Sequence, residues 1–277
     1  MDVNNLKNHA LNIRRNIVQM VYDAQSGHPG GSLGCADILT YLYFEEMNVN
    51  RDNVATTDRD RFVLSKGHCS PALYAVLHEA GLLDEDLKTF RQINSKLQGH
   101  PNMNETPGVD MSTGSLGQGI SAAAGMALGA KYTGKDLRVY TLLGDGEIEE
   151  GQVWEAMMFA HHHKLDNLCV IVDNNGLQID GRITDVMSPY PIPDKLRAFG
   201  LHVIEIDGHD FEQIEAAFNE ARSVKGVPTA IVMKTVKGKG VSFMEDKAGW
   251  HGKAPNDEEL QIALNELDTQ LAELEGK

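Results

Sequence analysis

The sequence predicts an α/β fold in which a doubly wound, mostly parallel sheet is flanked by helices. Short apolar runs alternate along the chain with longer segments of helical periodicity, as in strand–helix–strand units. Two apolar runs, at 139–143 and 168–172, are separated by one helical segment, and both end in polar residues and glycine. A connection of this length forms a right-handed crossover that places two parallel strands side by side.

The other elements are predicted from local pattern. Apolar residues at helical spacing between Leu6 and Ala24 predict a long first helix, and the proline- and glycine-rich segment 26–32 predicts a loop after it. The pattern further predicts helices over 37–46, 71–80, 211–224 and 257–275, strands over 61–65, 203–206 and 230–236, and an irregular segment over 96–115. Without repeats or a linker, we expect one domain over 1–277, with irregular N-terminal loops and a C-terminal helical extension.

The composition limits the possible partners. A net charge of −15, from 25 basic and 40 acidic residues, argues against nucleic acid. The three cysteines have no CxxC spacing and the N-terminus has no apolar signal segment, so we expect a cytoplasmic protein with reduced thiols. Segment 111–130 is uncharged, but its glycines and hydroxyl side chains predict a glycine-rich loop and a small-residue helix rather than a membrane span.

Two polar residues mark the candidate site. Asp145 and Asn175 lie 175 − 145 = 30 positions apart, each just after a predicted strand. Adjacent parallel strands bring their carboxyl ends together at the edge where open α/β folds bind ligands. Two oxygen ligands that leave other coordination positions open suit Mg²⁺ carrying a diphosphate, and Ca²⁺ is an acceptable substitute. In a protein this acidic, a metal and histidines must neutralise an anionic cofactor locally.

These motifs resemble a known family. A GDG sequence followed after about thirty residues by NN resembles the diphosphate-binding motif of thiamine diphosphate enzymes. In chain order, SGHPGGSLG, SKGHCSPALYA, QGHP, STGSLGQGIS, GDGEIEEGQVWEA, DNNGLQIDG, KTVKGKG and WHG resemble the successive motifs of transketolase. They cover nearly the whole chain but correspond only to that enzyme's diphosphate-binding domain. The resemblance is therefore to the N-terminal subunit of a split, two-gene transketolase.

The resemblance implies how this chain would bind thiamine diphosphate. Asp145, Asn175 and the carbonyl of Leu177 would hold the metal ion. His68, His251 and the Gly146 N–H would contact the diphosphate, which fits the attraction of helix N-termini for anions. The cofactor-binding set implied by the motifs is His68, Gly114, Ser115, Leu116, Gly144, Asp145, Gly146, Glu147, Asn175 and His251.

Within that set, the backbone from Gly114 to Leu116 would line the cofactor's rings, because small residues let the main chain approach closely. His28 and His100 would face the reacting C2 carbon and the hydroxyls of the donor sugar, and His251 joins them as a catalytic residue. A neutral imidazole can give or take a proton near neutral pH.

The implied activity is transfer of a two-carbon ketol unit from a ketose phosphate to an aldose phosphate, as in the pentose phosphate pathway. The family's pyrimidine-binding domain, with its cofactor-activating glutamate, and its phosphate-binding arginines match nothing in this chain. The expected partner is therefore a C-terminal transketolase subunit, carrying the pyrimidine-binding and C-terminal domains. By analogy with the intact dimer, the assembly would be a heterotetramer with two copies of each subunit.

Several alternatives stay open. The chain could belong to a split transketolase specialised for a modified sugar, or be a non-catalytic assembly module of the same fold. A 1-deoxyxylulose-5-phosphate synthase is disfavoured because the chain stops early, and a 2-oxo-acid dehydrogenase subunit would not carry both SGHPGG and WHG. Glu150 could complement the helix dipole or join a carboxylate network, the lysines of KTVKGKG could be solvated or bind phosphate, and Trp250 could be a lid or core.

Overall fold

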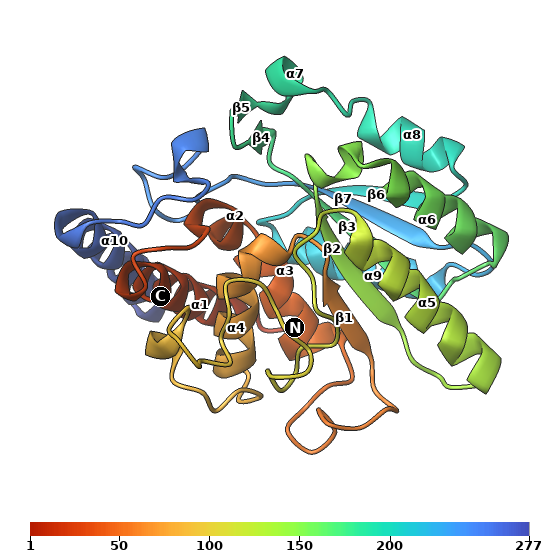
Figure 1. The fold of residues 1–277 in the computed structure, drawn as a ribbon, viewed down its shortest axis with the longest axis horizontal. Helices are drawn as coiled ribbons and strands as arrows, with labels where there is room; N and C mark the ends of the chain where they lie inside the picture. Colours follow the sequence, from red (N-terminus) through yellow and green to blue (C-terminus); the bar gives the residue numbers. More distant parts are fainter. Residues whose placement is uncertain (277) are drawn as a thin grey trace.

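A five-stranded parallel sheet forms the middle layer of the computed structural model, which describes residues 1–276 (Figure 1). The strands are ordered β1-β2-β3-β7-β6, and every neighbouring pair is parallel. Their bounds are Arg61–Leu64 for β1, Val139–Gly144 for β2, Leu168–Asn174 for β3, His202–Asp207 for β6 and Thr229–Lys234 for β7. The predicted α/β fold is confirmed.

Helices cover both faces of this sheet because its strands alternate their side chains between two cores. Val139 and Leu143 face the core under α5 (Gln118–Thr133), α6 (Gly151–His162) and α8 (Ile192–Ala198), whereas Tyr140 and Leu142 face the other core. The helices of that second core are α1 (Val3–Asp23), α3 (Ala36–Tyr41), α4 (Ser70–Glu79), α9 (Phe211–Ser223) and α10 (Asp257–Glu275). The sheet is therefore doubly wound, as predicted.

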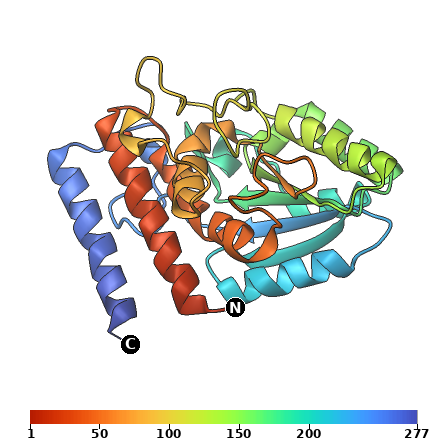
Figure 2. The same cartoon turned by 90° about the horizontal axis from the view of Figure 1, so that it is seen from below.

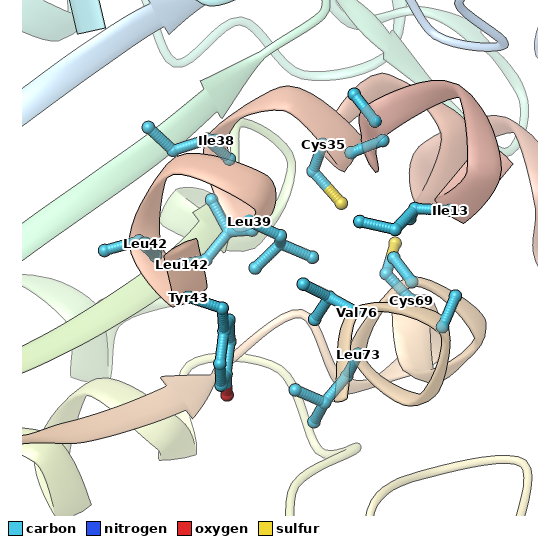
Figure 3. Close-up of a cluster of buried hydrophobic side chains, with 14 of the residues drawn as sticks. Ile13, Cys35, Ile38, Leu39, Leu42, Tyr43, Cys69, Leu73, Val76 and Leu142 are labelled. Carbon is cyan, nitrogen blue, oxygen red and sulfur yellow. The ribbon is translucent and has the colours of Figure 1, made fainter. Parts of the chain in front are cut away.

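The second core is deep, since α1 and α4 form a layer beyond α3. Figure 3 shows side chains from these helices and from β2 meeting in one apolar cluster that includes Ile13, Leu39, Leu73 and Leu142. Figure 2 shows α1 and α10 packed side by side at the outer edge. Burial of this kind fixes the N-terminal loops that reach the carboxyl edge of the sheet.

The glycine-rich segment differs from its prediction. Segment 26–32 was expected to be a loop, but helix α2 (Pro29–Gly34) begins inside it. Proline suits the first helical turn because its missing N–H has no intrahelical partner there, and the Ser32 hydroxyl donates to the His28 carbonyl. The expected helix over 37–46 is α3 followed by the wider turn η1 (Leu42–Glu46).

The short elements escaped the sequence pattern because they contain too few residues to show a period. A small antiparallel ribbon of β4 (Leu177–Gln178) and β5 (Gly181–Arg182) follows β3 and leads into α7 (Ile183–Val186). The single-turn helices are η2 (Gly67–Cys69), η3 (Leu87–Thr89), η4 (Glu147–Glu149) and η5 (Ala248–Trp250). Several of them carry site residues.

The first turn of helix α5 packs closely on the end of β1, and this contact requires glycine at position 119. A Cβ added to Gly119 would lie 2.6 Å from the Ser65 hydroxyl oxygen and 2.7 Å from its Cα. Within residues 1–276, none of the helices has the length and apolar character needed to cross a membrane.

A buried ion pair joins the N-terminal helices to the sheet. Arg14 on α1 donates two hydrogen bonds, of 3.0 and 2.6 Å, to the Asp37 carboxylate on α3. His209, after β6, lies 2.7 Å from the same carboxylate, and its Nε2 accepts the Val236 N–H beyond β7. Burial opposes ionisation of Asp37, but Arg14 and His209 outweigh it and hold the pKa at about 2.

We predict that Asp37→Ala lowers the free energy of unfolding by about 3–5 kcal/mol, because Arg14 is left buried without its counter-charge. Urea denaturation at pH 7 measures this loss. Because the pKa is lowered from 3.8 to about 2, the stabilisation is present above pH 4 and disappears as the pH falls toward 2.

The matched control is Asp84→Ala, which breaks the exposed pair between Asp84 and Arg51. Such exposed pairs contribute less than about 1 kcal/mol. Equal losses of unfolding free energy in the two variants would show that the buried pair stabilises the protein no more than the exposed pair does.

Candidate active site

A cavity of about 310 Å³ opens beside the carboxyl ends of β2 and β3. Most of the site residues predicted from the sequence line it, although they come from segments spread over more than 200 positions. The lining includes His28, His68, Gly114, Leu116, Gly144, Asp145, Gly146, Glu147, Asn175, Leu177 and His251. Ser115 and His100 lie outside this lining, although the His100 ring centroid is 6.3 Å from that of His28.

Asp145 and the Asn175 turn meet as the strand pattern predicted. β2 and β3 are in register with Gly144 opposite Asp173, so the residues that follow them lie together. The Asp145 carboxylate accepts the Gly176 N–H at 2.6 Å and the Gly146 N–H at 2.9 Å. The bond from Gly176 fixes the turn that follows β3 against the end of β2.

The Asn175 side chain shapes its own turn. Its Oδ1 accepts the Leu177 N–H at 3.1 Å, and its Nδ2 donates to the Asp173 carboxylate at 3.1 Å. This turn places the Asn175 amide and the first residue of β4 beside Asp145 at the cavity. The resulting oxygen donors are a carboxylate, a side-chain amide and a main-chain carbonyl, which are the groups that Mg²⁺ and Ca²⁺ prefer.

The Asp145 carboxylate is only 2% exposed. Its burial, followed by the nearby Asp173 carboxylate, raises the pKa of Asp145 to about 7. A buried carboxylate without a cation next to it favours the protonated form, and a bound divalent ion reverses that preference. The residues present therefore fit a metal ion bound at Asp145.

The four loop histidines form one cluster. The ring centroids of His28, His68 and His251 are 5.3 Å apart in each pair. Burial, followed by the neighbouring His68, lowers the pKa of His28 to about 4; burial, followed by Lys237, lowers that of His251 to about 3. Both shifts favour the neutral form of His28 and His251 near pH 7. The Nδ1 atom of His28 is buried and has no hydrogen-bond partner among residues 1–276.

The sequence prediction missed the buried charges beneath this cluster. Lys66, two positions after the end of β1, is 2% exposed and bonds the Asp173 carboxylate near the end of β3, which also accepts the Thr235 hydroxyl. The two residues meet across the end of β2, which lies between β1 and β3 in the sheet. Their place near the carboxyl ends of predicted strands was the only sequence signal for them. A lysine at a strand end otherwise suggests only a solvated turn.

Lys237, in the KTVKGKG segment, is buried rather than solvated. Its amino group lies 2.9 Å from His251 Nδ1 and donates to the Leu177 carbonyl at 3.3 Å. Burial, followed by the nearby Lys66, lowers its pKa to about 8. The alternative of a solvated Lys237 is wrong, and the cavity carries two buried lysines that favour an anionic ligand.

Two other predicted residues have structural partners. The Glu147 carboxylate accepts hydrogen bonds from the Ser65 hydroxyl and from the Gly117 and Gly144 N–H groups, so it fixes the turn after β2. Trp250 is buried with its ring centroid 5.2 Å from that of Phe243, as the core alternative requires. Glu150 is exposed.

The fold and the cavity are those of an α/β domain that binds a ligand at the carboxyl edge of a parallel sheet. The family model described as transketolase, thiamine diphosphate binding domain, matches residues 6–272. One apulose-4-phosphate transketolase subunit, from Phocaeicola vulgatus, is 41% identical over 99% of this chain and 98% of its own length. The 6-deoxy-6-sulfo-D-fructose transketolase subunit SqwG of a Clostridium species is 42% identical over 96% and 97%.

Solved structures agree. Transketolase from Leishmania mexicana matches 98% of this chain with a TM-score of 0.85 and 34% identity. The chain spans about half the length of that enzyme, 46%. The chain belongs to the transketolase family and carries its thiamine diphosphate-binding domain, so the family predicted from the sequence motifs is confirmed.

Proposed function

We propose that this chain is the diphosphate-binding subunit of a two-subunit transketolase. The assembly transfers a two-carbon ketol unit from a ketose phosphate to an aldose phosphate. The observation that carries the proposal is the meeting of Asp145 with the Asn175 turn in a cavity lined by histidines and buried lysines. Full-length similarity to proteins named as transketolase subunits supports it.

Asp145, Asn175 and the Leu177 carbonyl hold Mg²⁺ in this proposal, and His68 and His251 contact the diphosphate. Thiamine diphosphate supplies the electron sink that ketol transfer requires. His28 and His100 would act on the sugar by holding or moving a proton at a substrate oxygen, and a neutral ring suits that role.

A second subunit completes the site. Leu116 and Ile179 line the cavity but are 37% and 66% exposed, which is unusual for large apolar side chains at a functional cavity. A partner with a pyrimidine-binding domain and a C-terminal domain would cover them and supply the phosphate-binding arginines. A closed assembly with two copies of each chain follows the symmetry usual for such enzymes.

Specialisation for a modified sugar is a second candidate. The two relatives described above are named for apulose 4-phosphate and 6-deoxy-6-sulfofructose. A panel of donors that contains both compounds and ordinary ketose phosphates separates the candidates through kcat/KM. A preference above about tenfold for a modified donor, equal to about 1.4 kcal/mol of discrimination, would assign the specialised activity.

We predict that the purified chain has no ketol transfer and that the second subunit restores it. The product of an adjacent gene is the first candidate to add. Transfer is followed with a ketose phosphate donor, an aldose phosphate acceptor, thiamine diphosphate and Mg²⁺. Steady turnover by this chain alone would refute the requirement for a partner.

We predict that Asp145→Ala weakens thiamine diphosphate binding by more than about tenfold, because even outer partners of a metal ligand contribute that much. Calorimetric titration of the reconstituted complex in Mg²⁺ measures the effect, and Ca²⁺ should support binding by the unsubstituted protein. Asp136→Ala removes an exposed carboxylate as the charge-matched control. If the affinity for thiamine diphosphate did not change after complete chelation of divalent ions, the proposed metal site would be refuted.

We predict different effects for the two pairs of histidines. Alanine at His68 or His251 should raise the cofactor concentration needed for half activity. Alanine at His28 or His100 should lower kcat at saturating cofactor by on the order of 10²-fold, the usual effect of losing a positioned proton donor. His162→Ala, at the exposed end of α6, is the control. If all four variants changed cofactor affinity alone, His28 and His100 would have no catalytic role.

A further inference from the structure

Arg91 differs from the two most deeply buried arginines, Arg14 and Arg59. Arg14 and Arg59 are buried, and each forms a two-pronged pair with a carboxylate. Half-buried Arg91 forms no ion pair with residues 1–276. Its Nη1 donates to the Ser26 hydroxyl at 3.0 Å, and its buried Nε has no partner in the described chain. Holding a partly buried cation away from any counter-charge costs free energy. The placement of Arg91 therefore requires an explanation.

The backbone also holds Arg91 in an unusual conformation. Its φ is +60°, in the left-handed region that residues with a side chain rarely adopt, and its N–H donates to the Leu97 carbonyl at 2.8 Å. The neighbouring Phe90 and Leu97 are buried and anchor this loop. Packing therefore maintains a strained residue, which is a feature of functional sites.

The guanidinium lies between the two loops that carry the sugar-site histidines. Ser26 is two positions before His28, and Gly99 directly precedes His100. A Cβ added to Gly99 would lie 2.8 Å from the Arg91 Cζ, so the guanidinium rests against the backbone at this glycine.

The opposite side of the His100 loop is held by α4. The Ser70 hydroxyl donates to the Gly99 carbonyl at 2.8 Å, and the Tyr74 hydroxyl donates to the Gln98 carbonyl at 2.8 Å. Arg91 is therefore the contact that links this fixed loop to the segment before His28.

The charge of Arg91 also acts on the two imidazoles. The ionisable groups that face His100 are Arg91, His28, His68 and Cys69. Those that face His28 are Arg91, His68, Cys69, His100 and His251. Partial burial of the ring, followed by the Arg91 cation, lowers the pKa of His100. For His28, burial and His68 act first and Arg91 adds to them in lowering the pKa. A cation without a carboxylate beside it can act in this way because nothing cancels its field.

We propose that Arg91 is a positioning residue, whose contacts with Ser26 and Gly99 set the His28 and His100 loops relative to each other and whose cationic group acts on both imidazoles. The catalytic consequence rests on the proposed function, whereas the effect on the histidines belongs to the chain itself. Arg91 is not among the residues that line the cavity.

The first test is an NMR titration of histidine ring signals in the purified chain, with His100→Asn identifying the His100 signal. Arg91→Met should move the His100 midpoint to higher pH, because the cation that disfavours the imidazolium is gone. Arg91→Lys keeps the charge and should leave the midpoint near its original value. Arg51→Met removes an exposed arginine and should have no effect.

An unchanged His100 midpoint in folded Arg91→Met would overturn the electrostatic part of the proposal. If that variant does not fold, Gly99→Ala replaces it, since the added methyl group must displace the guanidinium. The His100 midpoint should again rise, and an unchanged midpoint has the same negative meaning.

The second test uses the reconstituted complex. Arg91→Met should lower kcat by roughly 10- to 100-fold through loss of geometry, with the half-saturating cofactor concentration unchanged and the acidic limb of the kcat profile moved to higher pH. Arg91→Lys should restore the pH profile but only part of kcat, because an ammonium does not reproduce the planar guanidinium. A loss confined to cofactor affinity would overturn the positioning role. An inactive unsubstituted complex would refute the proposed function and leave the NMR result standing.

Discussion

The site depends on one hydrogen bond between the ends of two strands. The Gly176 N–H donates to the Asp145 carboxylate at 2.6 Å and so fixes the turn after β3 to the end of β2. Parallel pairing in register makes this contact possible, because both strands end at the same edge. Without that bond, the amide of Asn175 and the carbonyl of Leu177 would not be held beside the carboxylate. The register of the sheet thus sets the proposed metal and diphosphate site.

Buried charges around this bond reconcile an acidic protein with an anionic ligand. The net charge of −15 repels a diphosphate at long range, yet Lys66 and Lys237 are both buried at the cavity. Asp173 partly compensates Lys66, while Lys237 has no carboxylate among its hydrogen-bond partners in residues 1–276. In a low-dielectric cavity such charges act strongly over a few ångströms, so the local field outweighs the overall charge.

The N-terminal helices act as a second support for the chemistry. They pack on the sheet through the apolar cluster around Leu39 and Leu142 (Figure 3). The pair of Arg14 with Asp37 joins α1 to α3, and His209 connects this pair to the end of β6. The segments that carry His28, His68 and Arg91 are flanked by buried helices and by strand β1, so core packing positions the histidines.

The sequence by itself determined the family, the parallel sheet and the meeting of Asp145 with Asn175, because strand periodicity and motif spacing are local signals. It did not reveal the helix within 26–32, the burial of Lys66 and Lys237, or the place of Arg91 between two loops. Those features depend on residues far apart in the chain, such as Ser26, Arg91 and Gly99, whose approach is decided by packing. The sequence shows which side chains can carry a charge. The burial and the neighbouring charges that set the pKa of each group arise only in the folded protein.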